Sequence, residues 1–450
     1  MFLRLRKVTR LATIALTLSI GLPNAAMAEP SGDLVIAVNS LGDESWTAAS
    51  TGPALQSAGL AIYDSLLIRS PEDGEITTGH GSLSEAMSWS DDRRALTIDL
   101  VDNAQFHGDW GPVTAEDVVY SMTLARDETS RNGHADRFRS FIDRIEVHDD
   151  HSLTFHLTKI GWDFPEELTD VFFHMPIMSK KYAEEVGVEE AGRNPIGSGP
   201  FQFESHTFGD RITVTAVEDH WHEAPNLASI TWRKVNDPSV RLAMLKSGEA
   251  HVTSIVYDQI AEAEAAGLQV KAMVGVNMVT VQFLGMYLDP TYDEEDTPPW
   301  AQGNWWEVGS DAHKVRQALS HAIDREAIVE FILQGYGSTD GASVSPFYPG
   351  SMGYDADKPV TSYDPDRALE LLAEAGYGDP ADLEIVVDLT PHSNRPYNKP
   401  VGEAIAAMWE GLGISVETRL STDYATLTGQ MRNREAFYAW TWAAPRFTRA

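Results

Sequence analysis

Apolar and polar residues follow two different periods along the chain, and this pattern predicts a mixed α/β protein. Residues 34–38 are an apolar run rich in β-branched side chains, which is typical of a buried strand. Residues 201–221 alternate apolar and polar positions and break at Gly209-Asp210, which predicts a two-stranded hairpin. A second hairpin is predicted over residues 142–157. The first half of the chain is therefore expected to contain several paired strands.

Helices are predicted where apolar residues recur at helical spacing between recognisable end signals. Thr114, with Asp117 three residues later, predicts the start of one helix. The apolar face of this helix carries Val118, Met122 and Ala125. Further helices are predicted to end near Gly248, to run through Val315, Ala318, Leu319, Ala322 and Ile323, to extend from Asp324 to Gly335, to lie between Asp364 and Gly376, and to span residues 401–411. Strand-like runs flank the last of these helices and complete a β-α-β order.

The stretch "NPIGSGPFQF" at residues 194–203 places a Gly-Ser-Gly turn between two prolines. A dinucleotide fingerprint would need a third glycine where Gln202 stands, and a phosphate loop would need Gly-Lys-Ser/Thr at its end. A hydrolase elbow has the spacing G-x-S-x-G, whereas Ser198 has a glycine directly on each side. Because none of these spacings is present, the segment is expected to turn the chain into the following hairpin.

The first 28 residues have the three parts of a secretory signal peptide. Four basic residues within the first ten precede an apolar run over residues 11–22, and residues 26–28 form an Ala-Met-Ala cleavage site. The apolar run is shorter than the roughly 18 residues that a membrane span requires. We therefore expect the chain to be exported to the periplasm and cleaved after residue 28.

Composition limits the partners and the environment of the exported chain. The chain has no cysteine, which excludes disulfides, thiolate metal ligands and the acylated cysteine of lipoproteins, so no lipid anchor is expected. The formal net charge of −33 becomes −37 once the four basic residues of the signal are removed. Such a surface repels nucleic acid and anionic lipid, so no nucleic-acid partner is expected. With 43% hydrophobic residues in 450 positions, the chain can build a large core spread over two or three domains.

Five segments resemble, in this order, the family 5 extracellular solute-binding proteins of peptide/nickel-type ABC importers. They are residues 111–122 (GPVTAEDVVYSM), 194–221, with Ser198 where the family usually has threonine, 246–255 (KSGEAHVTSI), 314–337 and 363–377. The resemblance extends from about Gly32 to about Trp442. It implies two lobes joined by crossing segments, a ligand in the cleft between them, and hinge closure that presents the loaded form to a membrane permease. It also implies no catalysis; we expect no cofactor and a monomer.

The resemblance predicts a first lobe over residues 29–275, with a subdomain at about 60–190, and a second lobe over residues 276–450. Mixed sheets and a hinge are expected, as in a periplasmic-binding-protein fold. Family members usually continue for several dozen residues beyond the segment that ends this chain. The second lobe is therefore expected to be truncated at its C-terminal end, and the sequence leaves open whether the chain is a fragment or a natural short variant.

Two histidine clusters raise the alternative of metal binding, since some relatives carry nickel. His220 and His222 would share a face if they lay on a strand. His148, His151 and His156 lie in the hairpin predicted over residues 142–157. Both clusters fall where the family has hairpin turns and strand edges, and the zinc-protease spacing H-E-x-x-H is absent, so no metal site is expected.

A secreted hydrolase of peptides or glycosides is the alternative from another functional class. Paired carboxylates are plentiful, but among 67 Asp and Glu residues such pairs arise by chance. No hydrolase elbow supports a catalytic triad. Turnover of peptide, ester or glycoside substrates would favour the enzyme, and saturable binding without turnover would favour the carrier.

Tryptophans in expected loops are candidate ligand contacts, because carrier clefts hold ligands against flat apolar faces. They are Trp46, Trp300, Trp305, Trp306, Trp440 and Trp442, and residues 287–310 are expected to form a long surface loop.

The last of these tryptophans lie in a segment that departs from the family. In peptide-binding relatives, a tryptophan segment late in the second lobe is followed by an aspartate that pairs with the peptide's α-ammonium. Here no carboxylate follows Trp440, and the segment instead offers Trp442 and the cation Arg446. The resemblance therefore implies weak or no binding of ordinary peptides by the usual anchor. It favours a sugar, a quaternary amine or an aromatic ligand stacked on Trp440 or Trp442. Packing of the second lobe is the alternative role for both tryptophans.

The first lobe is expected to supply the opposing ligand contacts. In the resemblance, Trp46 after the first strand, and Ser254 and Tyr257 after residues 248–253, lie at the mouth of the cleft. The ligand class stays open among peptides, peptide-like amines, oligosaccharides and metal chelates.

Overall fold

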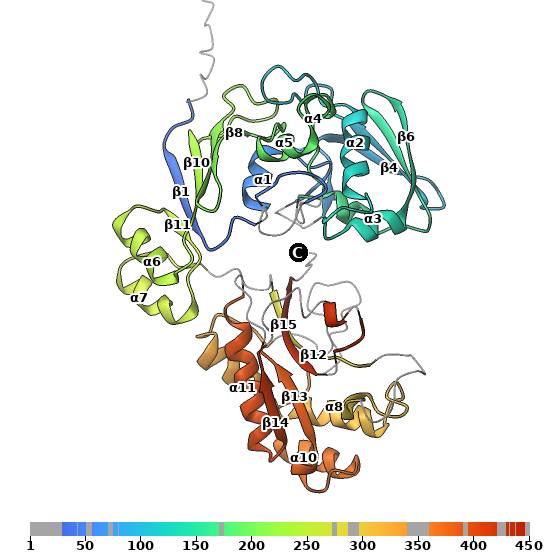
Figure 1. Ribbon diagram of the computed structural model, residues 1–450, viewed down its shortest axis with the longest axis vertical. Helices are drawn as coiled ribbons and strands as arrows, with labels where there is room; N and C mark the ends of the chain where they lie inside the picture. Colours follow the sequence, from blue (N-terminus) through green and yellow to red (C-terminus); the bar gives the residue numbers. More distant parts are fainter. Residues whose placement is uncertain are drawn as a thin grey trace, which may run out of the picture.

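The structure is a computed structural model that describes residues 29–42, 44–50, 56–70, 75–79, 81–170, 175–271, 277–286, 297–339, 360–389, 395–420, 429–431, 433–436 and 438–445. Side chains are described for these residues except 56–57, 277–278 and 441–445. Two lobes lie one above the other in Figure 1, and no sheet formed by the described strands extends across both. The chain is thus a two-lobed α/β protein, as its sequence predicts.

The five-stranded sheet of the first lobe brings together strands that are far apart in the sequence. Its order is β11 (Val252–Thr253), β1 (Asp33–Val38), β10 (Ser229–Lys234), β9 (Arg211–Ala216) and β8 (Phe201–Thr207). β1 pairs in parallel with β10 and β11, whereas β10, β9 and β8 are antiparallel. The hairpin predicted over residues 201–221 is confirmed as β8–β9, with Gly209 at positive φ in its turn.

A four-stranded antiparallel sheet extends the same lobe. Its order is β4 (Ser84–Trp89), β5 (Ala95–Leu100), β7 (Ser152–Leu157) and β6 (Ile142–Asp149), and α2 (Ala115–Ala125) and α3 (Ala135–Phe141) pack against β6. One apolar core joins the two sheets, with Leu96 and Phe155 from the second sheet and Val214 and Trp232 from the first. The predicted hairpin over residues 142–157 is confirmed as β6–β7.

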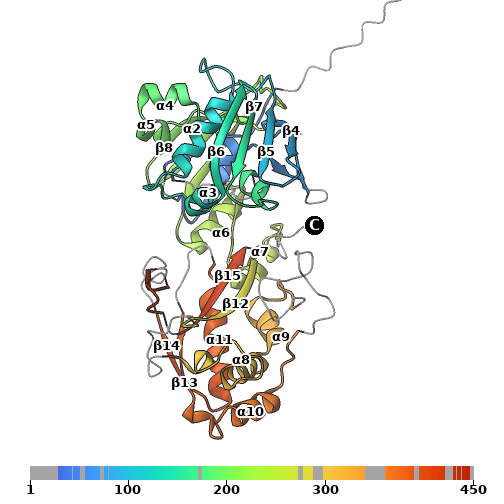
Figure 2. The same cartoon turned by 90° about the vertical axis from the view of Figure 1, so that its right-hand side faces the viewer.

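The remaining described elements before residue 271 are short, and two of them lie toward the second lobe. They are α1 (Gln56–Ile62), β2 (Ile68–Arg69), β3 (Ile76–Thr77), η2 (Phe164–Leu168), α4 (Lys180–Val186), α5 (Val188–Arg193), α6 (Pro238–Ser247), η3 (Tyr257–Gln259) and α7 (Ile260–Ala265). Figure 2 shows α6 and α7 below the sheets of the first lobe, next to the second lobe.

The second lobe is a four-stranded mixed sheet with helices on one face. Its order is β12 (Asn277–Phe283), β15 (Ala439–Pro445), β13 (Glu384–Asp388) and β14 (Ser415–Arg419). β13 is parallel to both β14 and β15, and β12 is antiparallel to β15. The other elements are η5 (Pro299–Ala301), α8 (Asp311–His321), α9 (Arg325–Ala327), the π-helical turn η6 (Ile328–Ile332), α10 (Pro365–Glu374), η7 (Pro380–Asp382) and α11 (Asn398–Gly411).

The helices of the second lobe pack on β13 through large apolar side chains. Leu319 of α8, Leu372 of α10 and Trp409 of α11 are fully buried with Ile385 and Val387. Trp409 Nε1 donates a hydrogen bond to the Leu319 carbonyl oxygen at 2.9 Å. The two apolar cores are therefore separate, while the predicted lobe boundary at 275–276 stays a prediction because residues 272–276 lie outside the described residues.

The Gly-Ser-Gly turn is buried and joins α1 to the β8–β9 hairpin. Gly199 N donates to the carbonyl oxygen of Ile62 at 2.9 Å, and His107 N donates to the carbonyl oxygen of Gly197 at 2.8 Å. A Cβ atom on Gly197 would lie 2.0 Å from the same Ile62 oxygen. Only glycine permits so close a backbone approach, and the segment turns the chain as predicted.

The predicted helix starts are confirmed where local sequence determines them. Thr114 and Asp117 form a capping box on α2, and the Asp364 side chain accepts a hydrogen bond from Arg367 N at the start of α10. Asp324 caps a helix as predicted, but the regular part, α9, is short and continues as η6.

The prediction that Trp300, Trp440 and Trp442 lie in loops is wrong, since Trp300 is in a 3-10 helix and the backbones of Trp440 and Trp442 are in strand β15. Trp300 lies in η5, is 1% exposed, and donates from Nε1 to the Leu284 carbonyl oxygen at 2.8 Å. Trp440 lies in β15, is 3% exposed, and packs with Tyr438. Residues 287–296 of the predicted surface loop lie outside the described residues. Trp300 and Trp440 therefore belong to the packed interior of the second lobe.

Candidate functional site

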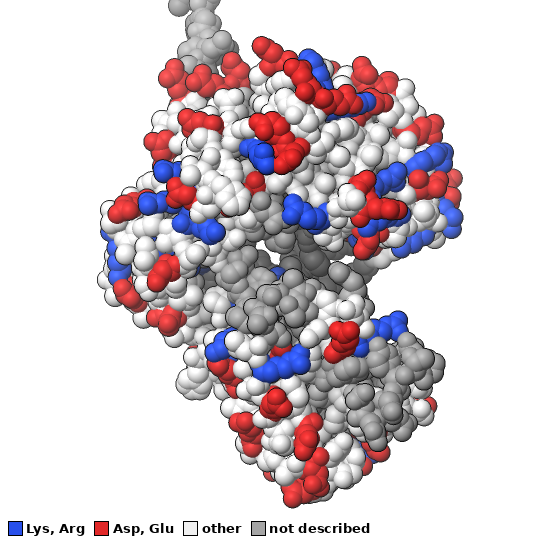
Figure 3. Space-filling model, viewed as in Figure 1, with Lys and Arg blue, Asp and Glu red and all other residues white. Residues whose placement is uncertain are grey.

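The lobes meet where the segment after β11 reaches the second lobe. The ring of Tyr257 in η3 contacts the ring of Tyr397 edge to face, with centroids 5.9 Å apart and planes at 72°. In α7, Glu264 Oε1 accepts a hydrogen bond from the Tyr336 hydroxyl at 3.2 Å. We refer to Tyr257, Glu264, Tyr336 and Tyr397 as the interlobe seam. Figure 3 shows the molecule hollowed on one side between the lobes.

The hydroxyls of Tyr257 and Tyr336 in the interlobe seam are neutral at physiological pH, because both have raised pKa values. Burial raises the pKa of the Tyr257 hydroxyl above its ordinary value. Loss of hydration and the Glu264 carboxylate raise the pKa of the Tyr336 hydroxyl in the same direction. A neutral phenol can donate or accept a hydrogen bond and offers a flat ring, which suits an uncharged part of a solute.

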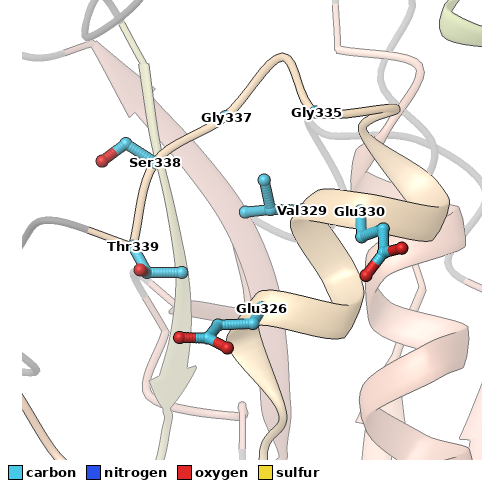
Figure 4. Close-up of a pocket in the computed structure, with 7 residues that line it drawn as sticks. All are labelled: Glu326, Val329, Glu330, Gly335, Gly337, Ser338 and Thr339. Atoms are coloured by element: carbon cyan, nitrogen blue, oxygen red, sulfur yellow. The ribbon is translucent and has the colours of Figure 1, made fainter.

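A cavity of about 450 Å³ lies beside Tyr336 in the second lobe. It is lined by Glu326, Val329, Glu330, Gly335, Gly337, Ser338 and Thr339. Figure 4 shows the side chains of Glu326 and Val329 directed from the helix toward the residues 335–339 segment. The carboxylates give this cavity an acidic lining, which favours a cationic or hydrogen-bond-donating group.

A charged pair occupies the carboxyl ends of the parallel strands β13 and β14. Arg419 Nε donates to Asp388 Oδ2 at 2.9 Å, and the guanidinium carbon lies 3.5 Å from the centroid of the Tyr438 ring. Asp388 is fully buried, whereas the Arg419 side chain is 36% exposed. Open α/β sheets bind ligands at the carboxyl ends of their strands, so Arg419 is a candidate for pairing with an anionic group.

The start of α11 carries a buried polar group next to the interlobe seam. Asn398, the residue after Tyr397, is 2% exposed, and neither Nδ2 nor Oδ1 has a hydrogen-bond partner among the described residues. The sequence analysis did not identify Tyr397 or Asn398, because nothing in the local pattern shows that η3 packs against residues 395–398. The "RPYN" turn before a helix was the available signal.

Of the predicted first-lobe contacts, Ser254 and Tyr257 lie near the seam. Ser254 is exposed, and its carbonyl oxygen accepts a hydrogen bond from Arg241 Nε at 3.2 Å. Trp46, by contrast, is 1% exposed in the first-lobe core. Its ring lies 5.2 Å from that of His206, edge to face, and His206 Nε2 pairs with Glu44 Oε2 at 2.6 Å. The structure thus brings Tyr257 to the second lobe and packs Trp46 elsewhere; their ligand roles stay predictions.

The predicted second-lobe contacts are only partly within the described residues. Trp440 pairs in register with Asp388 on β13, next to the Arg419 pair. The backbone of Trp442 pairs with Thr280 of β12, but its side chain lies outside the described set. Arg446 lies outside the described residues altogether. The predicted ligand roles of these three residues therefore stay predictions.

The histidine clusters make local contacts. His220 lies beyond β9 rather than on a strand, and its Nε2 donates to the Ser198 carbonyl oxygen at 2.9 Å. His148 Nε2 lies 2.8 Å from Thr154 Oγ1, and His156 Nε2 lies 2.9 Å from Glu146 Oε2. Within the described ranges, no group of three or more His, Asp or Glu side chains is arranged to hold a metal ion.

The sequence model of one protein family, described as bacterial extracellular solute-binding proteins, family 5 middle, matches residues 78–449. The chain belongs to this family. Within the part of this family 5 protein that the structure describes, no helix is long and apolar enough to cross a membrane.

Two curated relatives carry names that state a ligand. The dipeptide-binding protein of Escherichia coli is 26% identical over 390 residues, which are 82% of this chain and 67% of the relative. The glutathione-binding protein GsiB of Salmonella typhi is 30% identical over 304 residues, which are 66% of this chain and 53% of the relative. The family 5 protein thus aligns with between about half and two thirds of the length of these relatives.

A solved structure of similar fold is the oligopeptide-binding protein AppA of Bacillus subtilis in complex with a nonapeptide. It is 23% identical, with a TM-score of 0.68 over 92% of this chain and 80% of AppA. This likeness confirms the two-lobed fold. The family and the relatives are binders, which supports the solute-binding interpretation and gives the hydrolase alternative no support.

Proposed function

We propose that this family 5 protein captures a small solute between its lobes and delivers it to the permease of an ABC importer. The observation that carries the proposal is the interlobe seam, where Tyr257 and Glu264 on one side meet Tyr397 and Tyr336 on the other. A solute bound beside this seam contacts both lobes and so favours the conformation in which they approach. Differential binding of this kind is what converts capture into a signal that a permease can recognise.

Three features of the described residues narrow the chemical class of the solute. The tyrosine rings suit a flat or apolar part, the carboxylates at the cavity suit a cation or donor, and Arg419 suits an anionic group. Peptide-like molecules carry all three kinds of group, whereas sugars, quaternary amines and metal chelates carry fewer. The proposal therefore favours a peptide-like solute over the sugar, quaternary amine or aromatic ligand that the sequence favoured. We place Ser254 and Tyr257 on the first-lobe side of the solute and Trp442 and Arg446 on the second. Trp46 and Trp440 are packed in the apolar clusters of their own lobes.

We further propose that residues 1–28 are a cleaved signal peptide and that the mature protein acts as a monomer in the periplasm without a lipid anchor. Its strongly acidic composition supports a freely diffusing carrier, because a large net charge of one sign disfavours self-association.

A thermal-shift panel tests the proposed function. The purified protein would be mixed with Ala-Leu, glutathione, a nonapeptide, maltotriose, carnitine and a nickel–histidine chelate, one at a time. At least one peptide-like member is expected to raise the melting temperature in a saturable way, since a solute at about 100 times its Kd adds about 2.7 kcal/mol to the free energy of unfolding. Turnover of a panel member, or no shift with any of them, would count against the proposal.

Tyr257→Ala is expected to weaken binding of the panel member with the largest shift by about tenfold. The substitution removes the edge-to-face contact with Tyr397, which is worth about 0.5–1.5 kcal/mol, together with the flat surface offered to the solute. Tyr257→Phe keeps the ring and is expected to stay within about threefold of the wild type. Isothermal titration calorimetry measures both. Equal affinities of Tyr257→Ala and the wild type would show that the solute binds away from the seam.

A further inference from the structure

Asn398 is a buried side chain whose hydrogen-bonding capacity is unused. It is the first residue of the 14-residue helix α11 and is 2% exposed. Within the part of the chain that the structure describes, both its donor Nδ2 and its acceptor Oδ1 lack partners. Buried polar groups are almost always paired, because an unpaired donor or acceptor loses the hydrogen bonds that water gave it. A carboxamide with both atoms unpaired therefore needs an explanation in what it binds.

Asn398 is next in the chain to a residue that contacts the other lobe. It follows Tyr397, whose ring contacts Tyr257 of η3 at 5.9 Å between centroids. It also begins the helix that packs on β13 and β15, so its backbone is held in place by the core of the second lobe. A rigidly placed polar group next to a contact between two lobes is in the position that a specificity-determining residue requires.

The first turn of α11 favours a neutral group over an anion. Asn398 N already donates to the Arg395 carbonyl oxygen at 3.1 Å, and Val401 N donates to that of Tyr397 at 3.0 Å. Pro400 has no N–H to donate. Of the backbone donors in this turn, only Lys399 N has no acceptor among the described residues. The helix start therefore offers less to a carboxylate or phosphate than one with several free N–H groups, and the Asn398 side chain is the buried polar group beside it.

We propose that Asn398 reads an amide group of the bound solute. Nδ2 donates to the carbonyl oxygen, and Oδ1 accepts from the N–H, of one residue of an extended peptide-type solute. These two groups belong to neighbouring amides and point to the same side, whereas the C=O and N–H of a single trans amide point in opposite directions. This inference rests on the proposed function and deepens it, because it names the peptide-type amide as the group recognised at this position. Solutes without an amide, such as carnitine and maltotriose, gain nothing from the side chain.

Asn398→Leu tests the inference, because leucine has nearly the same shape as asparagine and no polar atom. The expected result is a melting temperature without solute equal to or above that of the wild type, since an unpaired buried carboxamide has been removed. The affinity for glutathione or Ala-Leu, whichever shifts the wild type more, is expected to fall at least tenfold. Asn398→Ala serves as a second variant and is expected to show the same loss of affinity.

Ser84→Ala is the matched control. The Ser84 hydroxyl is likewise buried with no partner in the described ranges, but it lies in β4 of the first lobe. Its loss is expected to leave the affinity within twofold of the wild type. The inference is overturned if Asn398→Leu binds the amide solute within twofold of the wild type, which would indicate that an ordered water satisfies the carboxamide. It is also overturned if both Asn398 variants fail to fold, which would make the side chain structural. If no panel member binds the wild type, the proposed function fails first.

Discussion

Gly197→Ala is expected to cost more than about 3 kcal/mol of stability, at or beyond the upper end of ordinary overpacking. The new Cβ would lie 2.0 Å from the Ile62 carbonyl oxygen, 2.8 Å from the carbonyl carbon and 2.9 Å from Tyr63 Cδ1. Two of these atoms belong to the backbone at the end of α1, so no side-chain rotation relieves the contact. Moving the turn away would break the bond from Gly199 N to the same oxygen.

Urea denaturation followed by circular dichroism measures this effect. Gly133→Ala is the control, because a Cβ at Gly133 meets nothing within 4 Å and its φ is not in the left-handed region. The control is expected to unfold within about 0.5 kcal/mol of the wild type. A Gly197→Ala protein as stable as this control would mean that α1 and the turn are not in contact.

Elements whose ends are determined by neighbouring residues could be predicted from the sequence. The capping box of Thr114 and Asp117 and the cap by Asp364 involve groups three residues apart, so the sequence contains the whole interaction. The turn at Gly209 follows from a single residue that tolerates positive φ. The Gly-Ser-Gly turn was also predicted correctly, by showing that no chemical motif fits its spacing.

Burial by distant parts of the chain could not be predicted in the same way. Trp300 was expected in a loop because prolines and acidic residues surround it, yet its ring packs against Phe283 of β12 with centroids 5.3 Å apart. Tyr257 and Tyr397 are 140 positions apart in the sequence, yet their rings are in contact. Asn398 becomes a candidate site residue only because this contact brings the other lobe next to it. The candidate site is made by tertiary packing, so the resemblance indicated its general place and missed most of its residues.

Two buried titratable side chains, Asp64 and His107, form hydrogen bonds with the Gly-Ser-Gly turn and have opposite effects on the pH dependence of stability. Asp64 Oδ2 accepts hydrogen bonds from Ser198 Oγ at 2.8 Å and Trp221 Nε1 at 3.0 Å, and burial nevertheless raises the pKa of this carboxyl to about 7. His107 Nε2 donates to the Gly199 carbonyl oxygen at 2.8 Å, and burial lowers the pKa of this imidazole to about 4. Both groups are thus neutral in the folded protein over much of the range between pH 4 and 7.

The two pKa shifts have opposite signs in the pH dependence of stability. For Asp64, the folded state holds the proton up to about pH 7 while the unfolded state releases it near 3.8, so stability falls as pH rises through this window. For His107, the unfolded state binds a proton below about 6.5 that the folded state accepts only near 4, so stability falls as pH decreases. Each pKa unit corresponds to about 1.4 kcal/mol, so the two contributions of up to about 3–4 kcal/mol largely cancel.

Asp64→Asn is expected to gain about 2–4 kcal/mol relative to the wild type between pH 4.5 and pH 7.5. The asparagine oxygen can accept the bonds from Ser198 and Trp221, so the shape and hydrogen bonding of the site are kept while the ionisation of a buried carboxyl is abolished. Urea denaturation at several pH values measures the difference between the two proteins. A constant difference across this range would show that the Asp64 carboxyl titrates near its ordinary pKa, and hence that the turn is hydrated rather than buried.

His107→Gln is the counterpart that separates titration from general damage at the turn. Glutamine can donate to the Gly199 carbonyl oxygen as Nε2 does, but it does not titrate. Its stability relative to the wild type is therefore expected to rise as pH falls from 7 to 4.5, opposite in sign to Asp64→Asn, by about 1–3 kcal/mol. If both variants instead lose stability by a pH-independent amount, their effect comes from packing, and the opposing titrations do not exist. If the two variants show opposite pH dependences, the ionisations of Asp64 and His107 offset each other in the wild type. The free energy of unfolding of the first lobe would then change little between about pH 4.5 and 7.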